Sequence, residues 1–275
     1  MTPREAFDAF DTALKEGRPP ILPTDVPPSA FICAPPRSGS TLLYQALAYQ
    51  GEVGFIDNLS ARFAGDPPLG ALLSRALAAP KVFTGHSNFG RTDHITEPHE
   101  FGLGWERLLG GVGVAEPDPP VALTAEAVHR IETLLRAFDR PTVFKSFAYL
   151  WHASALAEAL PKSVWIRLLR PIAETARSLE ALYEARRATA TNAPWQSAVC
   201  AATRRGVTCL TIDERTRRQI EDLDRHIARQ FDMIAPERQI AITFDDLVSD
   251  PLGTASSLLQ QFGFPLDPQA LEKTS

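Results

Sequence analysis

The chain of 275 residues is predicted to adopt an α/β fold, in which a parallel sheet lies between two layers of helices. Short apolar runs of strand length alternate with stretches of helical periodicity, which is the pattern of βαβ units. The first run, residues 30–34, leads directly into a small-residue loop and then a helical pattern. The predicted strands are residues 30–34, 53–56, 81–84, 142–144, 164–169 and 239–244, and the predicted helices are residues 151–160, 172–187, 213–234 and 254–262.

The length of the chain fits a single domain. Residues 1–29 are predicted to form a short amphipathic helix and a proline-rich lead-in, and residues 30–262 form the core. Two regions interrupt the alternation of strands and helices, residues 85–116, with 7 of the 16 glycines, and residues 188–213. Long loops inside a compact domain are commonly lids or binding loops. Both regions therefore fit either loops that cover a binding site or irregular surface connections, and they are the candidate lid and acceptor loops.

The charge of the chain limits its partners. The net charge is −5, so the chain as a whole is not a polyanion binder and we expect no nucleic-acid partner. The charge is uneven, because residues 162–238 hold 14 Lys and Arg against 10 Asp and Glu. This stretch fits either mixed-charge surface helices or a site for a small anion.

The cysteine content and hydropathy exclude further classes. The 3 cysteines are an odd number without CxxC spacing, so neither a disulfide framework nor a zinc site is predicted. No stretch approaches the ~18 apolar residues of a membrane span, and the first ten residues lack the apolar region of a secretory signal. We therefore expect a protein of the reducing cytoplasm.

Residues 35–41 have the composition of a phosphate-binding loop. They lie between a predicted strand and a helix, so the unpaired N–H groups and the dipole of the helix start would face an anion. Gly39 allows the backbone to approach that anion closely. Ser40 and Thr41 add hydroxyl donors, and Arg37 supplies a cation from inside the loop.

This loop differs from the nucleoside-triphosphate loop G-x-x-x-x-G-K-[ST] at two positions. Ala34 stands at the first glycine and Ser40 at the lysine, whereas Gly39 and Thr41 match the pattern. The lysine that reaches the terminal phosphates of ATP is therefore absent. The sequence predicts a fold like that of P-loop NTPases, with an anion other than a Mg²⁺-bound triphosphate.

Four segments in order resemble motifs of sulfotransferases, particularly bacterial members of that family. Residues 36–43 (PRSGSTLL) resemble the loop that holds the 5′ end of 3′-phosphoadenosine 5′-phosphosulfate (PAPS), and residues 143–146 (VFKS) resemble the strand that ends in a lysine at the sulfuryl site. Residues 167–171 (RLLRP) with Ser178 resemble the 3′-phosphate site. Residues 242–251 resemble the turn beside the adenine, with Phe244 in place of the usual tyrosine.

This resemblance covers residues 30–262 and implies transfer of SO₃ from PAPS to a hydroxyl or amine, without a metal and with 3′-phosphoadenosine 5′-phosphate (PAP) as product. It assigns catalytic roles to Lys145 and Arg37, which would stabilise charge on the bridging leaving oxygen. Arg170 and Ser178 would distinguish a 3′-phosphorylated nucleotide from ATP. The implied nucleotide-binding residues are Arg37, Ser38, Gly39, Ser40, Thr41, Leu42, Arg170, Ser178 and Phe244.

The general base, which takes the proton of the acceptor, has two leading candidates. In tyrosine-protein relatives the base is a glutamate shortly after the second strand, and the matching residue here is Asp57. The predicted lid offers Glu100 instead. Steroid and phenol relatives use a Lys-Thr-His arrangement, but Lys145 is followed by Ser146-Phe147, which argues against a histidine base at this point.

The histidines of the lid are secondary candidates. His86 and His99 would be the next choices for the base. The spacings of His86, His94 and His99 do not match two ligands on one turn of a helix, so no metal site is expected there.

Two other functions compete with a PAPS-dependent sulfotransferase. One is an ATP-dependent small-molecule kinase, which the missing lysine and the Arg170–Ser178 pair disfavour. The other is a non-catalytic PAP-binding protein that has lost its base. The acceptor is expected to be a small molecule, and the sequence determines neither its identity nor the oligomeric state.

Overall fold

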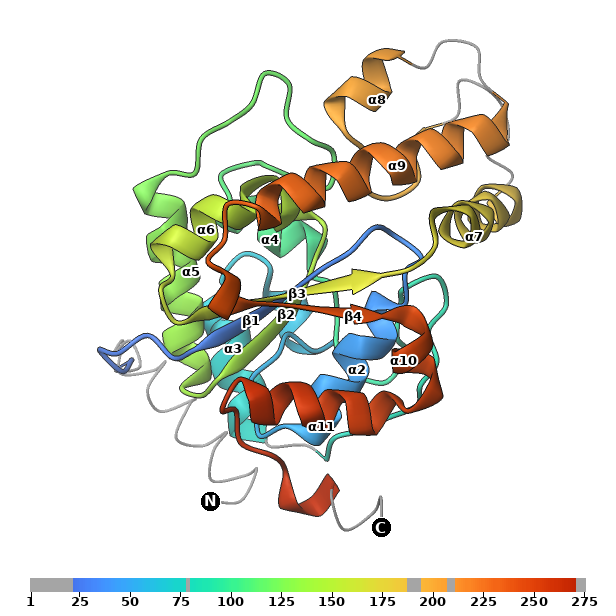
Figure 1. Cartoon of the computed structure of the whole chain (residues 1–275). Coiled ribbons are helices and arrows are strands. Elements are labelled where there is room, and N and C mark those ends of the chain that lie inside the picture. The colour runs from blue at the N-terminus through green and yellow to red at the C-terminus, as the bar shows by residue number, and fades with distance from the viewer. Residues whose placement is uncertain (1–21, 78–79, 187–193, 207–210, 271–275) are drawn as a thin grey trace.

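Four parallel strands form the centre of the molecule in the order β2-β1-β3-β4 (Figure 1). The computed structural model describes residues 22–77, 80–186, 194–206 and 211–270. The strands are β1 (Ser29–Cys33), β2 (Thr142–Lys145), β3 (Ser163–Leu169) and β4 (Gln239–Thr243). Every residue of β1 and β2 is buried, as expected where helices cover both faces of a parallel sheet.

Helices cover the two faces of this sheet. The α-helices are α2 (Ser40–Gln50), α3 (Pro67–Leu77), α4 (Gly102–Leu108), α5 (Ala125–Phe138), α6 (Ala153–Ala159), α7 (Ile172–Ala185), α8 (Ala201–Gly206), α9 (Ile212–Phe231), α10 (Phe244–Ser249) and α11 (Pro251–Gln261). Three short 3₁₀ helices are η1 (Ser60–Phe63), η2 (Ala148–His152) and η3 (Pro236–Arg238). Among the helices described, none has the length and apolarity of a membrane span.

The alternation of side chains along β1 explains the two layers of core. Ala30 and Ile32 face α2 and α11, whereas Phe31 and Cys33 face the layer that contains α4, α5, α6 and α9. Phe31 stacks on Trp165 of β3 with ring centroids 4.5 Å apart. Figure 1 shows α2 and α11 on one side of the sheet and α5, α6 and α9 on the other. The predicted three-layer α/β fold is confirmed.

Two predicted strands are wrong. Residues 53–56 and 81–84 form no strand, although Gly54 makes an isolated parallel bridge to Thr142. A Cβ on Gly54 would lie 2.8 Å from the Phe138 ring, so this apolar run packs against α5. Lys81 lies outside the sheet, and its ammonium forms an ion pair with Asp267 at 3.1 Å. Short apolar runs are buried in many ways other than as strands.

The sequence analysis did not predict α3, α4, α5 and α8, and the other differences concern element boundaries. The predicted helix over residues 151–160 is η2 followed by α6, and the helix predicted from residue 254 begins at Pro251. Phe244 is the first residue of α10 and not the last residue of β4. The helix predicted near the N-terminus lies largely outside the described residues, and residues 22–28 form neither helix nor strand.

Candidate functional site

A cavity of about 540 Å³ opens at the C-terminal ends of the four strands. The loop after β1 supplies Arg37, β2 ends at Lys145, and Arg170 and Phe244 follow β3 and β4 directly. Because parallel strands end at the same edge of a sheet, these four segments of the sequence meet there. The strand order places the β1 loop between Lys145 on one side and Arg170 on the other.

The β1 loop presents the start of α2 to this cavity. Arg37 and Gly39 adopt positive φ angles of 69° and 92°, and Gly39 is the N-cap of α2 without a side-chain cap. The N–H groups of the first turn therefore have no partner inside the helix. Ser40 and Thr41 line the cavity. Ser38 differs from them, because its buried hydroxyl donates to the carbonyl of Pro35 at 2.7 Å within the loop.

The residues predicted for the 3′-phosphate lie together. Arg37 Nε donates to Ser178 Oγ at 3.2 Å, and Arg170 Nη1 donates to the carbonyl of Arg37 at 2.8 Å. The Arg170 guanidinium lies 3.9 Å from the centroid of the Phe244 ring. Its buried Nε makes no hydrogen bond in the described part of the chain, but it forms an ion pair with Glu174 at 3.6 Å. An anion bound here would therefore share Arg170 with Glu174.

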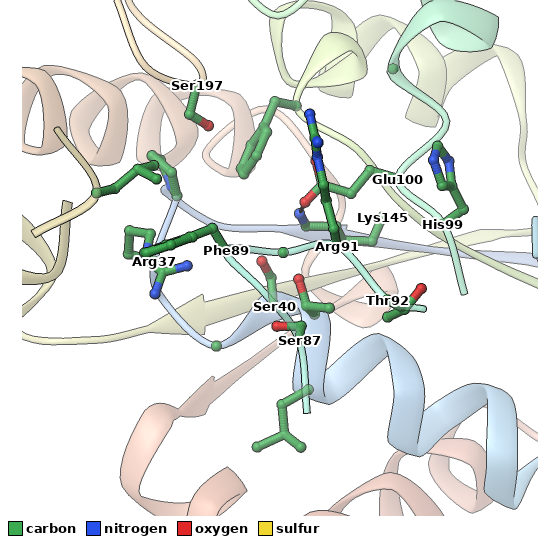
Figure 2. Close-up of a pocket in the computed structure, with 18 of the residues that line it drawn as sticks. Arg37, Ser40, Ser87, Phe89, Arg91, Thr92, His99, Glu100, Lys145 and Ser197 are labelled. Carbon is green, nitrogen blue, oxygen red and sulfur yellow. Dashed lines mark hydrogen bonds and ion pairs between the residues drawn. The ribbon is translucent and has the colours of Figure 1, made fainter. Parts of the chain in front are cut away.

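Lys145 and Glu100 form an ion pair at the other end of the cavity (Figure 2). Lys145 is 3% exposed, whereas the side chain of Glu100 is 30% exposed. Burial and the nearby charge of Arg37 lower the pKa of Lys145 to about 7. The Glu100 carboxylate opposes this shift, because an adjacent anion favours the charged form of lysine.

Asp57 does not line the cavity. Its carboxylate accepts from the Ser60 amide at 2.6 Å and from the Ser74 hydroxyl at 2.5 Å. Asp57 is 5% exposed. In this position it fixes the turn that leads into η1 and ties that turn to α3.

The predicted lid region reaches the cavity through three stretches, namely residues 87–92, residues 99–102 and Val114. Phe89 and Arg91 belong to residues 87–92, and His99 precedes Glu100. His99 Nδ1 accepts from the Phe101 amide at 2.8 Å. Burial, and then the positive charges of Arg62 and Arg91, lower the pKa of His99 below its usual value. His86 does not line the cavity, and neither His86, His94 nor His99 belongs to a possible metal-ligand group among the described residues.

Sequence reasoning missed several lining residues, namely Phe89, Arg91, Phe147, Arg186 and Ser197. Phe89, Arg91 and Ser197 fall within residues 85–116 and 188–213, which were predicted as binding loops, whereas Phe147 and Arg186 lie outside both regions. Five cations line the described cavity, at positions 37, 91, 145, 170 and 186, and its lining carboxylate is that of Glu100. Such a lining attracts an anionic ligand.

A parallel sheet with a glycine-containing loop before α2 and a cationic cavity at its strand ends defines an α/β protein of the P-loop class. The chain belongs to the sulfotransferase family, whose model matches residues 28–268. This confirms the predicted family and the prediction that the protein is a sulfotransferase.

Solved structures support the same fold. The chain is similar to sulfotransferase STF1 from Mycobacterium tuberculosis H37Rv, with a TM-score of 0.58 and 15% identity, covering 98% of this chain and 74% of that one. It is also similar to sulfotransferase STF9 from Mycobacterium avium, with a TM-score of 0.60 and 12% identity, covering 97% and 69%. No curated protein sequence matches significantly.

Proposed function

We propose that the protein transfers the sulfuryl group of PAPS to a hydroxyl or amine of a small-molecule acceptor. One observation carries the proposal. Arg170 lies at one end of the cavity, the β1 loop with Arg37, Ser40 and Thr41 lies in the middle, and the Lys145–Glu100 pair lies at the other end. A nucleotide with phosphates at both its 3′ and 5′ positions matches this distribution of donors. The lysine then lies where the transferred group would be.

The donor end has three parts. Arg170, which lies beside the β1 loop, and Ser178 would take the 3′-phosphate. The first-turn N–H groups of α2, with Ser40, Thr41 and Leu42, would take the 5′ end. Phe244 offers a ring beside Gly39, although Arg170 occupies one face of that ring.

The chemistry needs alignment and neutralisation of charge more than covalent participation. The acceptor oxygen or nitrogen forms a bond to sulfur, and the bond from sulfur to the bridging oxygen of the 5′-phosphate breaks. Lys145 and Arg37 would stabilise the negative charge that develops on that bridging oxygen. PAP then leaves with both phosphates.

Glu100 is the better candidate for the general base. It lines the cavity next to Lys145, whereas both oxygens of the Asp57 carboxylate are occupied by Ser60 and Ser74. A base must lie within reach of the proton that it removes. We therefore assign the acceptor proton to Glu100, with His99 as the next cavity residue to test.

Calorimetry and a transfer assay test the proposal together. PAP is expected to bind at least tenfold more tightly than 5′-AMP, because a charge-assisted hydrogen bond contributes about 1.5–3 kcal/mol. PAPS with radioactive sulfur, incubated with a panel of small alcohols, phenols and amines, is expected to label at least one acceptor. Equal affinity for PAP and AMP would contradict the 3′-phosphate assignment.

A lysine substitution separates catalysis from binding. Lys145→Ala is expected to lower turnover about 10²–10³-fold with a smaller change in PAP affinity, because the lysine acts mainly on charge formed in the transition state. Lys162→Ala is the control, since Lys162 pairs with Asp25 on the surface. Tight PAP binding without transfer to any acceptor would favour a non-catalytic binding protein, and Mg²⁺-dependent turnover of ATP would favour a kinase.

A further inference from the structure

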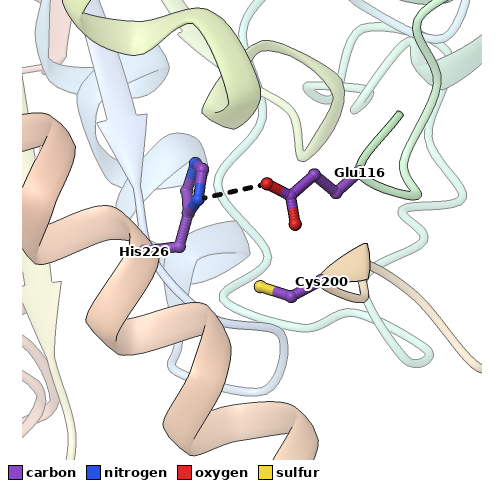
Figure 3. A group of neighbouring side chains, drawn as sticks. All are labelled: Glu116, Cys200 and His226. Carbon is purple, nitrogen blue, oxygen red and sulfur yellow. Dashed lines mark ion pairs between the residues drawn. The ribbon is translucent and has the colours of Figure 1, made fainter. Parts of the chain in front are cut away.

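A second group of reactive side chains lies outside the cavity. Glu116, Cys200 and His226 each direct one potential ligand atom inward, and these atoms all lie within 4.8 Å of one another (Figure 3). Glu116 lies in the loop between α4 and α5, Cys200 directly precedes α8, and His226 lies within α9. Cys200 and His226 are buried, and the Glu116 side chain is 24% exposed.

We propose that Glu116, Cys200 and His226 bind a divalent cation of the zinc type. One sulfur, one nitrogen and one oxygen donor form a set suited to zinc, whereas magnesium and calcium take oxygen ligands alone. In a tetrahedral zinc site with the usual bond lengths, ligand atoms lie about 3.3–3.6 Å apart. The Nδ1 of His226 and Oε1 of Glu116 are already 3.7 Å apart.

The second contacts of these residues hold the donor atoms in place. His226 Nε2 lies 3.3 Å from the carbonyl of Leu150, so an N–H at Nε2 leaves Nδ1 free to ligate. Metal-binding histidines commonly use such a backbone carbonyl to fix the ring. Glu116 Oε2 accepts from the Ala201 amide at 2.7 Å, which turns Oε1 toward His226. The partial exposure of Glu116 gives a cation a route from solvent.

A bound cation would join two segments that also line the cavity. Ala115 and Val199 form an isolated parallel bridge, and the Glu116 amide donates to the Val199 carbonyl at 3.0 Å. Val114 and Ser197, on the other side of this bridge, line the cavity. The cation would therefore fix this wall of the cavity against α9.

Cobalt(II) spectroscopy tests the site without any activity measurement. The full chain without a histidine tag, in a Cys209→Ser background to avoid a competing thiol, is stripped with a chelator and titrated with Co²⁺. One equivalent is expected to produce sulfur-to-cobalt charge-transfer absorption and the intense d–d bands of tetrahedral cobalt. One equivalent of Zn²⁺ is expected to remove both and to raise the midpoint of thermal unfolding.

Matched variants decide whether these three residues are the ligands. Cys200→Ala is expected to abolish the charge-transfer band, whereas Cys33→Ala, a second buried cysteine, is expected to retain it. Glu116→Gln keeps an acceptor for the Ala201 amide and is expected to weaken binding at least tenfold, as is His226→Gln. An absent charge-transfer band in the parent protein, or a band that survives in Cys200→Ala, would overturn the proposal.

Discussion

The Lys145–Glu100 pair makes the protonation of the lysine depend on a carboxylate from the predicted lid region. The perturbation that reveals this dependence is Glu100→Gln, which removes the charge and nearly preserves the shape of the side chain. Lys145 is buried, and Arg37 adds a second positive charge nearby. Glu100 is the carboxylate in contact with it. We therefore expect the pKa of Lys145 to fall when the carboxylate is neutralised.

The size of the fall follows from the geometry. Two unit charges 4 Å apart interact by about 4 kcal/mol at an effective dielectric constant of 20. Because the Glu100 side chain is 30% exposed, solvent screens a substantial part of this energy. A remaining coupling of about 1.4 kcal/mol corresponds to one pKa unit, so a fall of at least about one unit is expected.

Carbon-13 NMR of the reductively methylated protein measures this pKa directly. The chain contains only five lysines, at positions 15, 81, 145, 162 and 273, and the Lys145→Arg variant assigns the relevant signal. Glu106→Gln, which changes an exposed glutamate of α4, is the control and should leave that pKa unchanged. If Lys145 titrated at the same pH with and without the Glu100 charge, the electrostatic argument would be refuted.

The same coupling sets the direction of the pH–rate profile. Stabilisation of the leaving oxygen requires protonated Lys145, so activity is lost as the pH rises through the pKa of that lysine. In Glu100→Gln this alkaline loss should therefore move to lower pH. The variant should also lose about 10²–10⁴ in rate if Glu100 is the base.

Three further substitutions test the remaining parts of the site. Arg170→Ala should remove most of the preference for PAP over AMP, as calorimetry with both nucleotides would show; an undiminished preference would place the 3′-phosphate elsewhere. Gly39→Ala should weaken PAP binding at least tenfold, because its φ is +92° and the new Cβ would lie 2.8 Å from the Phe244 ring; Gly206→Ala, with open space around it and outside the cavity lining, should bind PAP normally. Asp57→Asn should lower the free energy of unfolding by about 1–3 kcal/mol in urea titrations, since it alters one buried and one partly buried hydrogen bond, and should keep the acid limb of the pH–rate profile; loss of that limb would restore Asp57 as the base.

The sequence predicted the proximity of the residues at the strand ends more completely than that of the residues around Glu100. The loop at residues 35–41 and Arg170 lie directly at strand ends, where a local pattern of strand, loop and helix determines their position. Arg37 and Ser178 are 141 residues apart, yet they are hydrogen-bonded, because β1 and β3 are neighbours in the sheet. A parallel order of strands was sufficient to bring these motifs together.

The end of the cavity that holds Glu100 depends on long-range contacts that leave no periodic signal. Asp57 and Glu100 were equally plausible while a strand was predicted over residues 53–56. In the structure that strand is absent, and the hydroxyl of Ser74, from a helix that the sequence analysis did not predict, accounts for one oxygen of Asp57. The position of Glu100 depends instead on Lys145, 45 residues further along the chain.

The packing of Phe244 against Gly39 has a consequence for how this site can vary among related sequences. The Phe244 ring occupies the space that a Cβ at position 39 would need. The Arg170 guanidinium carbon lies 3.9 Å from the centroid of the same ring. A larger residue at position 39 would require a smaller one at position 244, and the guanidinium at position 170 would then lose its aromatic support. The three positions are therefore expected to change together or not at all. Substitutions at positions 39 and 244 that restored the fit of the loop would still alter the preference for PAP over AMP, because Arg170 would have lost its contact with the ring.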